Sequence, residues 1–189
     1  MENEKEFAKE SDKEFVYPKE STSEEMQTYD DSMGKIYDVY KLIAFAEALP
    51  EETVSVDALA ERVFREKTWQ DVNGHYVSPG EIYNVAKENG EKNHGVIDWE
   101  ELQEKYPDLA FHLEKLGVIN YETPILLSRE NIIIDGIHRV LRAYIDGVKE
   151  IKAKRFDELP ESALLSEDLR GKAHINNLDK KIGKEKYYD

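Results

Sequence analysis

Apolar positions along this chain follow two spacings, one typical of helices and one typical of short strands. Between Lys35 and Leu49 the apolar residues recur at helical spacing, which predicts a helix that ends before Pro50. The β-branched run Thr53–Val56 predicts a strand, and Asp57 is placed to cap a second helix. This mixture of helices and short strands indicates an α+β fold.

The central residues, 69–116, carry mostly helical signals and are predicted to form a helical insertion. Asn73-Gly74 is a turn signal between two short apolar runs, so a hairpin is expected before the first helix of this region. The run Ser78–Glu81 fits a capping box with proline at the first helical position. Asp98 and Pro107 mark the starts of two further helices.

Three more short strands are expected after the insertion, and with the first strand they would form a small mixed sheet. The apolar runs Tyr121–Leu127 and Ile132–Ile134 are joined by the polar residues Ser128–Asn131, which predicts a hairpin. The last strand, Ile151–Phe156, alternates apolar with charged residues, and we expect it at an edge of the sheet.

Residues 132–151 combine a strand, a tight turn and a helix start in a way that suits an anion. Asp135 and Gly136 follow three β-branched residues, and the helical segment opens with His138 and Arg139. Backbone N–H groups in a first helical turn lack intrahelical partners, and the helix dipole adds positive charge there. Gly136 allows a ligand close to the backbone, and Arg139 can form paired hydrogen bonds to a phosphate. The pattern therefore predicts a phosphate site with His138 and Arg139 as cationic donors.

The same residues also fit a purely structural role. Asp135 can cap the helix, Gly136 can serve the turn, and Arg139 can pair with a surface carboxylate. Arg142, further along this helix, is expected to face solvent.

The composition narrows the classes of function. At 189 residues the chain suits one domain, and its net charge of −15 argues against non-specific DNA binding, which needs concentrated lysine and arginine. The absence of cysteine excludes disulfides, thiolate metal sites and cysteine nucleophiles. No long apolar run or signal-type segment is present, so we expect a soluble, cytoplasmic protein without a membrane partner.

Acidic residues are concentrated near the N-terminus. Residues 1–31 carry eleven Asp or Glu against four Lys, and we expect an acidic, disordered arm over residues 1–34. The folded domain would then span 35–170, with a lysine-rich tail at 171–189. The arm is either a solvating segment or a surface that mimics nucleic acid.

Metal-binding motifs are not evident. His75, His94 and His112 show no ligand spacing, and His112 is expected to be a satisfied surface or core histidine. We therefore expect no metal site built from protein ligands alone.

The run Gly136-Ile137-His138-Arg139, followed by Ala143, Gly147 and a strand from Glu150, resembles the nucleotide-binding motif of the ParB/sulfiredoxin superfamily. The Asp-Gly-x-His-Arg form looks closest to free-serine kinases and to sulfiredoxins. Sulfiredoxins carry a reactive cysteine where this chain has Ile137, so that chemistry is not expected. The resemblance covers residues 54–156 and implies a ParB/sulfiredoxin-like fold.

In those families the motif contacts nucleotide phosphates. The resemblance therefore implies that Gly136, His138 and Arg139 contact the phosphates of a nucleotide. We expect ATP, ADP or CTP, with Mg²⁺, to be bound by the five residues Asp135, Gly136, Ile137, His138 and Arg139.

Phosphoryl transfer would require a carboxylate for Mg²⁺ or for a proton, beside a cationic clamp. We expect Asp135 to supply the carboxylate, with Glu61 as a further base from the first strand–helix junction. His138 and Arg139 would form the clamp. The first hypothesis is thus ATP- or ADP-dependent phosphoryl transfer to a small-molecule or protein acceptor, or nucleotide hydrolysis.

Two other classes stay open. A nucleotide-gated switch, or a binding module related to DNA partition, would need only nucleotide binding and slow hydrolysis. Partition proteins add DNA-binding and dimerisation parts, and the residues after Phe156 are too few for these, so DNA clamping is not expected. The third class is an acidic decoy that binds and inhibits a nucleic-acid-binding protein. The oligomeric state does not follow from the sequence.

Overall fold

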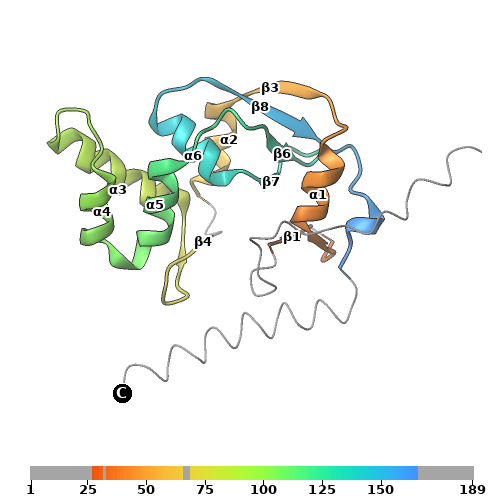
Figure 1. Ribbon diagram of the computed structural model, residues 1–189, viewed down its shortest axis with the longest axis horizontal. Helices are drawn as coiled ribbons and strands as arrows, with labels where there is room; N and C mark the ends of the chain where they lie inside the picture. Colours follow the sequence, from red (N-terminus) through yellow and green to blue (C-terminus); the bar gives the residue numbers. More distant parts are fainter. Residues whose placement is uncertain (1–26, 32, 66–68, 166–189) are drawn as a thin grey trace, which may run out of the picture.

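The computed structural model describes residues 27–31, 33–65 and 69–165, and these form a mixed α+β fold (Figure 1). The α+β class is therefore confirmed. The largest sheet has four strands in the order β3, β8, β6, β7. Their bounds are Glu51–Ser55 (β3), Glu150–Arg155 (β8), Ile125–Leu127 (β6) and Ile133–Asp135 (β7).

Strand β8 lies inside the four-stranded sheet, so its predicted place at a sheet edge is wrong. It pairs antiparallel with β3 and parallel with β6. The charged residues of β8 form ion pairs with carboxylates of the neighbouring strand β3. Lys152 pairs with Glu51 at 3.5 Å, and Arg155 pairs with Glu52 at 2.6 Å. An interior strand tolerates charged residues here because oppositely charged partners lie beside them.

The first helix begins later than the apolar pattern predicts. Residues Ile36–Asp38 form strand β2, and helix α1 spans Val39–Ala46. The buried carboxylate of Asp38 accepts hydrogen bonds from the backbone N–H of Tyr40 at 2.9 Å and of Lys41 at 3.3 Å. An extended N-cap residue therefore ends the strand and starts the helix.

Part of the expected acidic arm belongs to the folded chain. Thr28–Asp30 form strand β1, which pairs antiparallel with β2. The ring of Tyr29 is buried, and its centroid lies 6.4 Å from that of Tyr37. The rest of the arm, 1–26, and the expected tail, 171–189, lie outside the described residues.

Helix α2 (Val56–Val63) is capped by Ser55, so the prediction of Asp57 as the cap is wrong. The hydroxyl of Ser55 accepts a hydrogen bond from the backbone N–H of Ala58 at 3.4 Å. Asp57 lies in the first turn, where a negative charge suits the helix dipole, and it pairs with Lys149 at 3.3 Å.

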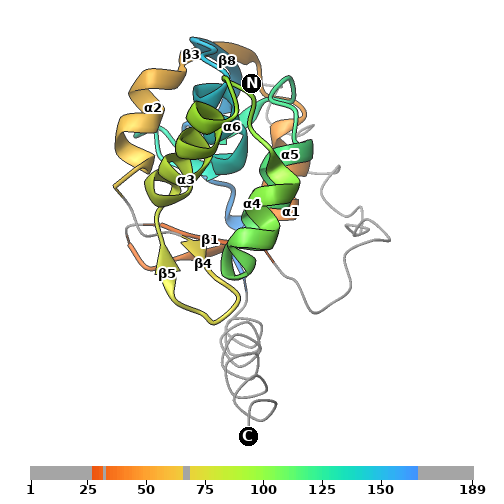
Figure 2. The same ribbon diagram turned by 90° about the vertical axis from the view of Figure 1, so that its left-hand side faces the viewer.

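The hairpin and the helix starts predicted within residues 69–116 are confirmed (Figure 2). The capping box at Ser78 is complete. The side chain of Ser78 accepts a hydrogen bond from the backbone N–H of Glu81, and the side chain of Glu81 accepts one from the backbone N–H of Ser78. The elements are β4 (Trp69–Gln70), β5 (Tyr76–Val77), α3 (Pro79–Lys92), α4 (Trp99–Lys105), a 3-10 turn (Pro107–Leu109) and α5 (Ala110–Val118).

Helix α6 (Ile137–Ile145) lies between the large sheet and helices α3 to α5 (Figures 1 and 2). On one side Val140 and Ala143 pack with apolar residues of α2, β6 and β8. On the other side Leu141 packs with those of α3, α4 and α5. The two halves of the domain are therefore joined through α6. Among the described residues, no helix has both the length and the apolar character needed to cross a membrane.

The prediction that Arg142 of α6 faces solvent is wrong. Its Nη1 donates to the carbonyl oxygen of Leu116 at 2.5 Å, and its Nε donates to Asp146 at 2.8 Å. The guanidinium also lies 5.5 Å from the centre of the Trp99 ring. The last carbonyl groups of α5 lack intrahelical partners, and Arg142 satisfies one of them.

Candidate functional site

The predicted strand, tight turn and helix start are confirmed at residues 133–145. β7 ends at Asp135, Gly136 is the N-cap of α6 with a φ of 111°, and α6 begins at Ile137. A Cβ atom on Gly136 would lie 2.5 Å from Cγ2 of Ile125. Glycine is therefore required both for the left-handed backbone and for the close approach of the turn to β6.

The N-terminus of α6 has no side-chain cap. Asp135 could have capped it, but forms an ion pair with Arg139, four residues later. The other carboxylate oxygen of Asp135 accepts a hydrogen bond from Nε2 of Gln27 at 3.4 Å. The pairing of Arg139 with a carboxylate, which the sequence allows, is thus observed. The partial positive charge of the helix start is left without a capping oxygen.

Arg139 is held against the turn and is largely shielded from solvent. Its side chain is 13% exposed. Its Nε lies 3.0 Å from the position that a Cβ of Gly136 would take. Among the described residues this buried Nε has no hydrogen-bond partner. A buried N–H without an acceptor is costly, and an incoming oxyanion would satisfy it.

His138 does not supply the positive charge that the sequence predicts. Its ring stacks on the indole of Trp69, with centroids 4.1 Å apart and planes inclined by 16°. Burial first, then the nearby charges of Lys115 and Arg139, lowers the pKa of His138 to about 3. The imidazole is therefore neutral at pH 7, and the expectation of a cationic donor at this residue is wrong.

A hydrogen bond joins His138 to His112 of α5. Nε2 of His112 lies 2.9 Å from the carbonyl oxygen of Gln70, so it carries the proton and donates it to that oxygen. Nδ1 of His112 then accepts a hydrogen bond from the Nε2–H of His138, at 3.0 Å. Burial also lowers the pKa of His112. His112 is a satisfied core histidine, as predicted, and it ties the first turn of α6 to β4.

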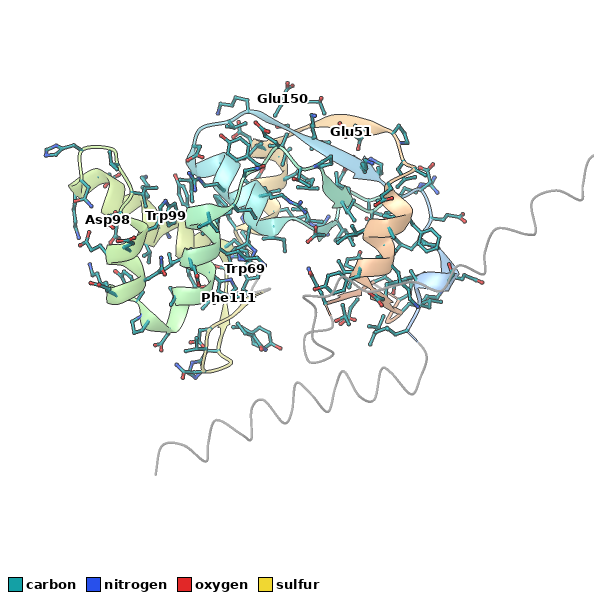
Figure 3. All side chains as sticks on the ribbon, in the orientation of Figure 1. Glu51, Trp69, Asp98, Trp99, Phe111 and Glu150 are labelled. Carbon is teal, nitrogen blue, oxygen red and sulfur yellow. The ribbon has the colours of Figure 1, made fainter. Side chains whose placement is uncertain are left out.

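Two further residues of α5 lie beside His138, and the sequence did not single them out. Phe111 is 58% exposed, and its ring meets that of His138 edge-on with centroids 6.5 Å apart. Nζ of Lys115 lies 5.3 Å from the centre of the Phe111 ring. Figure 3 draws Phe111, on α5, and Trp69, on β4, in the same region of the view. Phe111 and Lys115 are four residues apart, so the sequence could have indicated that they share one face of a helix. It could not have indicated that this face lies against α6, because that depends on tertiary packing.

Of the remaining predicted site residues, Glu61 lies outside the motif and Ile137 turns its side chain into the core. Glu61 is exposed on α2, and its carboxylate pairs with Arg65 at 3.6 Å. The side chain of Ile137 packs with the apolar residues of α3 to α5. The described part of the chain contains no group of three His, Cys, Asp or Glu side chains able to hold a metal. Mg²⁺ beside Asp135 would need nucleotide phosphates as further ligands.

Two pockets of the structure lie away from the motif. One, of about 260 Å³, is formed by β3, α2 and Asn131. The other, of about 430 Å³, lies against the β1–β2 hairpin and the segment after β8. Residues 135–139 line neither of them. The phosphate hypothesis therefore depends on the start of α6 and on Arg139.

No protein-family model, curated protein or solved structure matches this chain. The resemblance to the ParB/sulfiredoxin superfamily stays a prediction from the motif. The candidate site therefore rests on its own geometry.

Proposed function

We propose that this protein binds a nucleotide through its phosphate groups at the N-terminus of α6. The observation that carries the proposal is the uncapped start of α6 directly after Gly136, with the unpartnered Nε of Arg139 in its first turn. Phosphates bind at such helix starts because backbone N–H groups and the helix dipole favour negative charge. The motif spacing supports the same proposal, and with it we propose a ParB/sulfiredoxin-type fold.

A nucleotide-gated switch is the form of this function that the contacts favour. In the free protein the Arg139 guanidinium is paired with Asp135, which also accepts a hydrogen bond from Gln27 beside β1. An incoming phosphate competes with Asp135 for Arg139, since both are oxyanions that a guanidinium binds. Asp135 would then be free to move, and a movement of its carboxylate would change the hydrogen bond with Gln27. A ligand that binds only this opened arrangement shifts the population towards it.

Phosphoryl transfer or nucleotide hydrolysis is the second candidate, because Asp135 places a carboxylate directly beside the proposed phosphate site. This carboxylate could hold Mg²⁺ that arrives with ATP or ADP, or accept a proton from a hydroxyl. His138 is neutral and cannot act as the clamp, and Glu61 lies on an exposed helix face. A small-molecule or protein acceptor would therefore have to react beside Asp135.

Calorimetric titration of the full chain with ATP, ADP and CTP, with and without Mg²⁺, tests nucleotide binding. Arg139→Ala should weaken affinity about 30-fold or more, since a charge-assisted pair contributes about 2–3 kcal/mol. Arg65→Ala removes an exposed arginine outside the site and should leave the affinity unchanged. Absence of binding by all three nucleotides, in both conditions, overturns the proposal.

Asp135→Asn separates the switch from the enzyme. A switch predicts tighter nucleotide binding by this variant, because Arg139 is no longer neutralised by a carboxylate. An enzyme predicts weaker Mg²⁺-dependent binding and loss of phosphate release from ATP. Both readouts are made on the same preparation.

A further inference from the structure

We propose that the nucleotide at α6 stacks its base on the ring of Phe111, with Lys115 beside it. This proposal rests on the proposed nucleotide site and adds the residues that hold the base. Two observations support it. An exposed aromatic ring lies next to the first turn of α6, and a lysine ammonium lies over that ring.

The position of Phe111, more than its exposure, makes it a candidate for stacking on a base. It is 58% exposed, while its neighbours His112 and Leu113 are buried. Single exposed apolar residues are common on protein surfaces, so exposure alone does not indicate a site. The ring of Phe111, however, meets the edge of His138, the second residue of α6, with centroids 6.5 Å apart. The exposed ring therefore lies beside a side chain from the first turn of α6, the turn that also carries Arg139.

The separation between Phe111 and the start of α6 is held by packing. His138 stacks on Trp69 and hydrogen-bonds to His112, the residue that follows Phe111 in α5. A nucleotide carries its phosphates and its base on opposite sides of the ribose. One ligand can therefore contact the start of α6 with its phosphates and Phe111 with its base. The Phe111 ring is already exposed in the free protein, whereas the phosphates first have to displace Asp135 from Arg139.

Lys115 adds positive charge at the same place. Its Nζ lies 5.3 Å from the centre of the Phe111 ring, and its charge also contributes to the lowered pKa of His138. A base can displace an exposed lysine from an aromatic face, because base stacking is the stronger contact. The displaced ammonium then has the phosphates as an anionic partner. Aromatic and cationic contacts are thus combined within one turn of α5.

Stacking on Phe111 would not select one base. Every base has a π-face, so stacking is tolerant of base identity. We therefore expect ATP and CTP to depend on Phe111 alike. Inorganic tripolyphosphate, which has no base, should not depend on it.

Calorimetric titration of the full chain with ATP, CTP and tripolyphosphate tests this proposal. Phe111→Ala should weaken ATP and CTP binding about fivefold or more, and tripolyphosphate binding by less than about twofold. Phe111→Trp keeps a stacking surface and should retain ATP affinity. Phe45→Ala removes a phenylalanine of α1 that is 45% exposed, and should change neither affinity. Melting temperatures of the variants show that they are folded.

Each contrary result has its own meaning. If Phe111→Ala weakens tripolyphosphate as much as ATP, the ring does not act on the base and the proposal fails. If Phe111→Ala changes nothing while Arg139→Ala weakens both ligands, the nucleotide site stands and the base lies elsewhere. If the wild-type protein binds neither ATP nor tripolyphosphate, the nucleotide function itself is overturned.

Discussion

Gly136 fixes the geometry of the candidate site, because its backbone and its neighbours both exclude a side chain. Its φ is 111°, and an added Cβ would lie 2.9 Å from Cβ and 2.5 Å from Cγ2 of Ile125. Ile125 is fully buried in β6 and has little room to move. We expect Gly136→Ala to lower the free energy of unfolding by about 2–4 kcal/mol, from backbone strain and overpacking together. Urea denaturation measures the difference.

Gly147 offers the matched control for this substitution. Its φ is also positive, at 72°, but an added Cβ would have no atom within 4 Å. Gly147→Ala should therefore cost only the backbone strain, about 1–2 kcal/mol. Equal losses at the two glycines would show that the contact with Ile125 contributes nothing.

His138 makes the stability of the protein depend on pH. Its pKa is lowered to about 3 in the folded state, whereas an exposed histidine has a pKa of about 6.5. As the pH falls below about 6.5 the unfolded chain takes up a proton that the folded state does not bind. Stability contributed by the neutral ring is therefore present above about pH 6.5 and is lost towards pH 3.

Urea denaturation at two pH values tests this dependence. For His138 alone we expect the free energy of unfolding to fall by about 1 kcal/mol between about pH 7 and pH 5.5. His112, whose pKa is also lowered, should add to the loss. The variant His138→Phe should lose less of its free energy of unfolding over this pH range, because the contribution of His138 is absent. The same loss in the variant and the wild type would contradict a buried, neutral ring.

The chemistry of single residues was predictable only where it is local. Gly136 and the helix start after it follow from the residues around them, and the structure confirms both. The charge state of His138 does not, because it is set first by burial, to which the stacked ring of Trp69 belongs, and then by the charge of Lys115, both far away in the sequence. The buried Nε of Arg139 is equally a product of packing. Sequence reasoning therefore placed the turn but assigned His138 the wrong charge.

At the scale of elements, the capping signals at Ser78 and Asp98 were reliable, whereas the cap at Asp57 and the neighbours of the strands were predicted wrongly or missed. The capping box at Ser78 and the cap at Asp98 appear in the structure as predicted. The three-residue strands β1 and β2 were not foreseen, since each is stabilised by the other and by the core beneath. The interior position of β8 was not predicted, because its charged residues are typical of an edge strand and their ion-pair partners on β3 are distant in the sequence.

Arg142 joins two elements, and its loss should weaken their packing. It hydrogen-bonds from α6 to the Leu116 carbonyl of α5 and to Asp146. Arg142→Ala should lower the free energy of unfolding by about 2 kcal/mol, because it leaves a partly buried carbonyl unsatisfied. Lys87→Ala, which removes an exposed pair with Glu91, should cost less than about 0.5 kcal/mol. Similar losses in the two variants would mean that Arg142 is only a surface charge.

At the scale of the whole molecule, the N-terminal region consists of residues 1–26 and of the folded segment that contains strand β1. Two deletions of different length distinguish the contributions of these two parts. Deleting residues 1–26 leaves β1 in place, whereas deleting 1–31 also removes Tyr29 and the hydrogen bond from Gln27 to Asp135. We expect the longer deletion to be less stable than the shorter one by about 2–4 kcal/mol, since it loses a buried aromatic ring and strand pairing. Equal unfolding midpoints would show that β1 contributes nothing to the fold.

The shorter deletion also tests the acidic-decoy hypothesis. Residues 1–26 contain nine acidic residues and four lysines, which is −5 of the net charge of −15. A decoy that depends on this charge would lose a basic partner on deletion, and its binding would fall steeply with salt. We expect the full chain and the deletion to retain the same partners and the same nucleotide affinity, because the proposed chemistry lies at residues 135–139. Pull-downs at low and moderate salt, beside calorimetry, measure both. Loss of a basic partner with unchanged nucleotide affinity would instead favour the decoy.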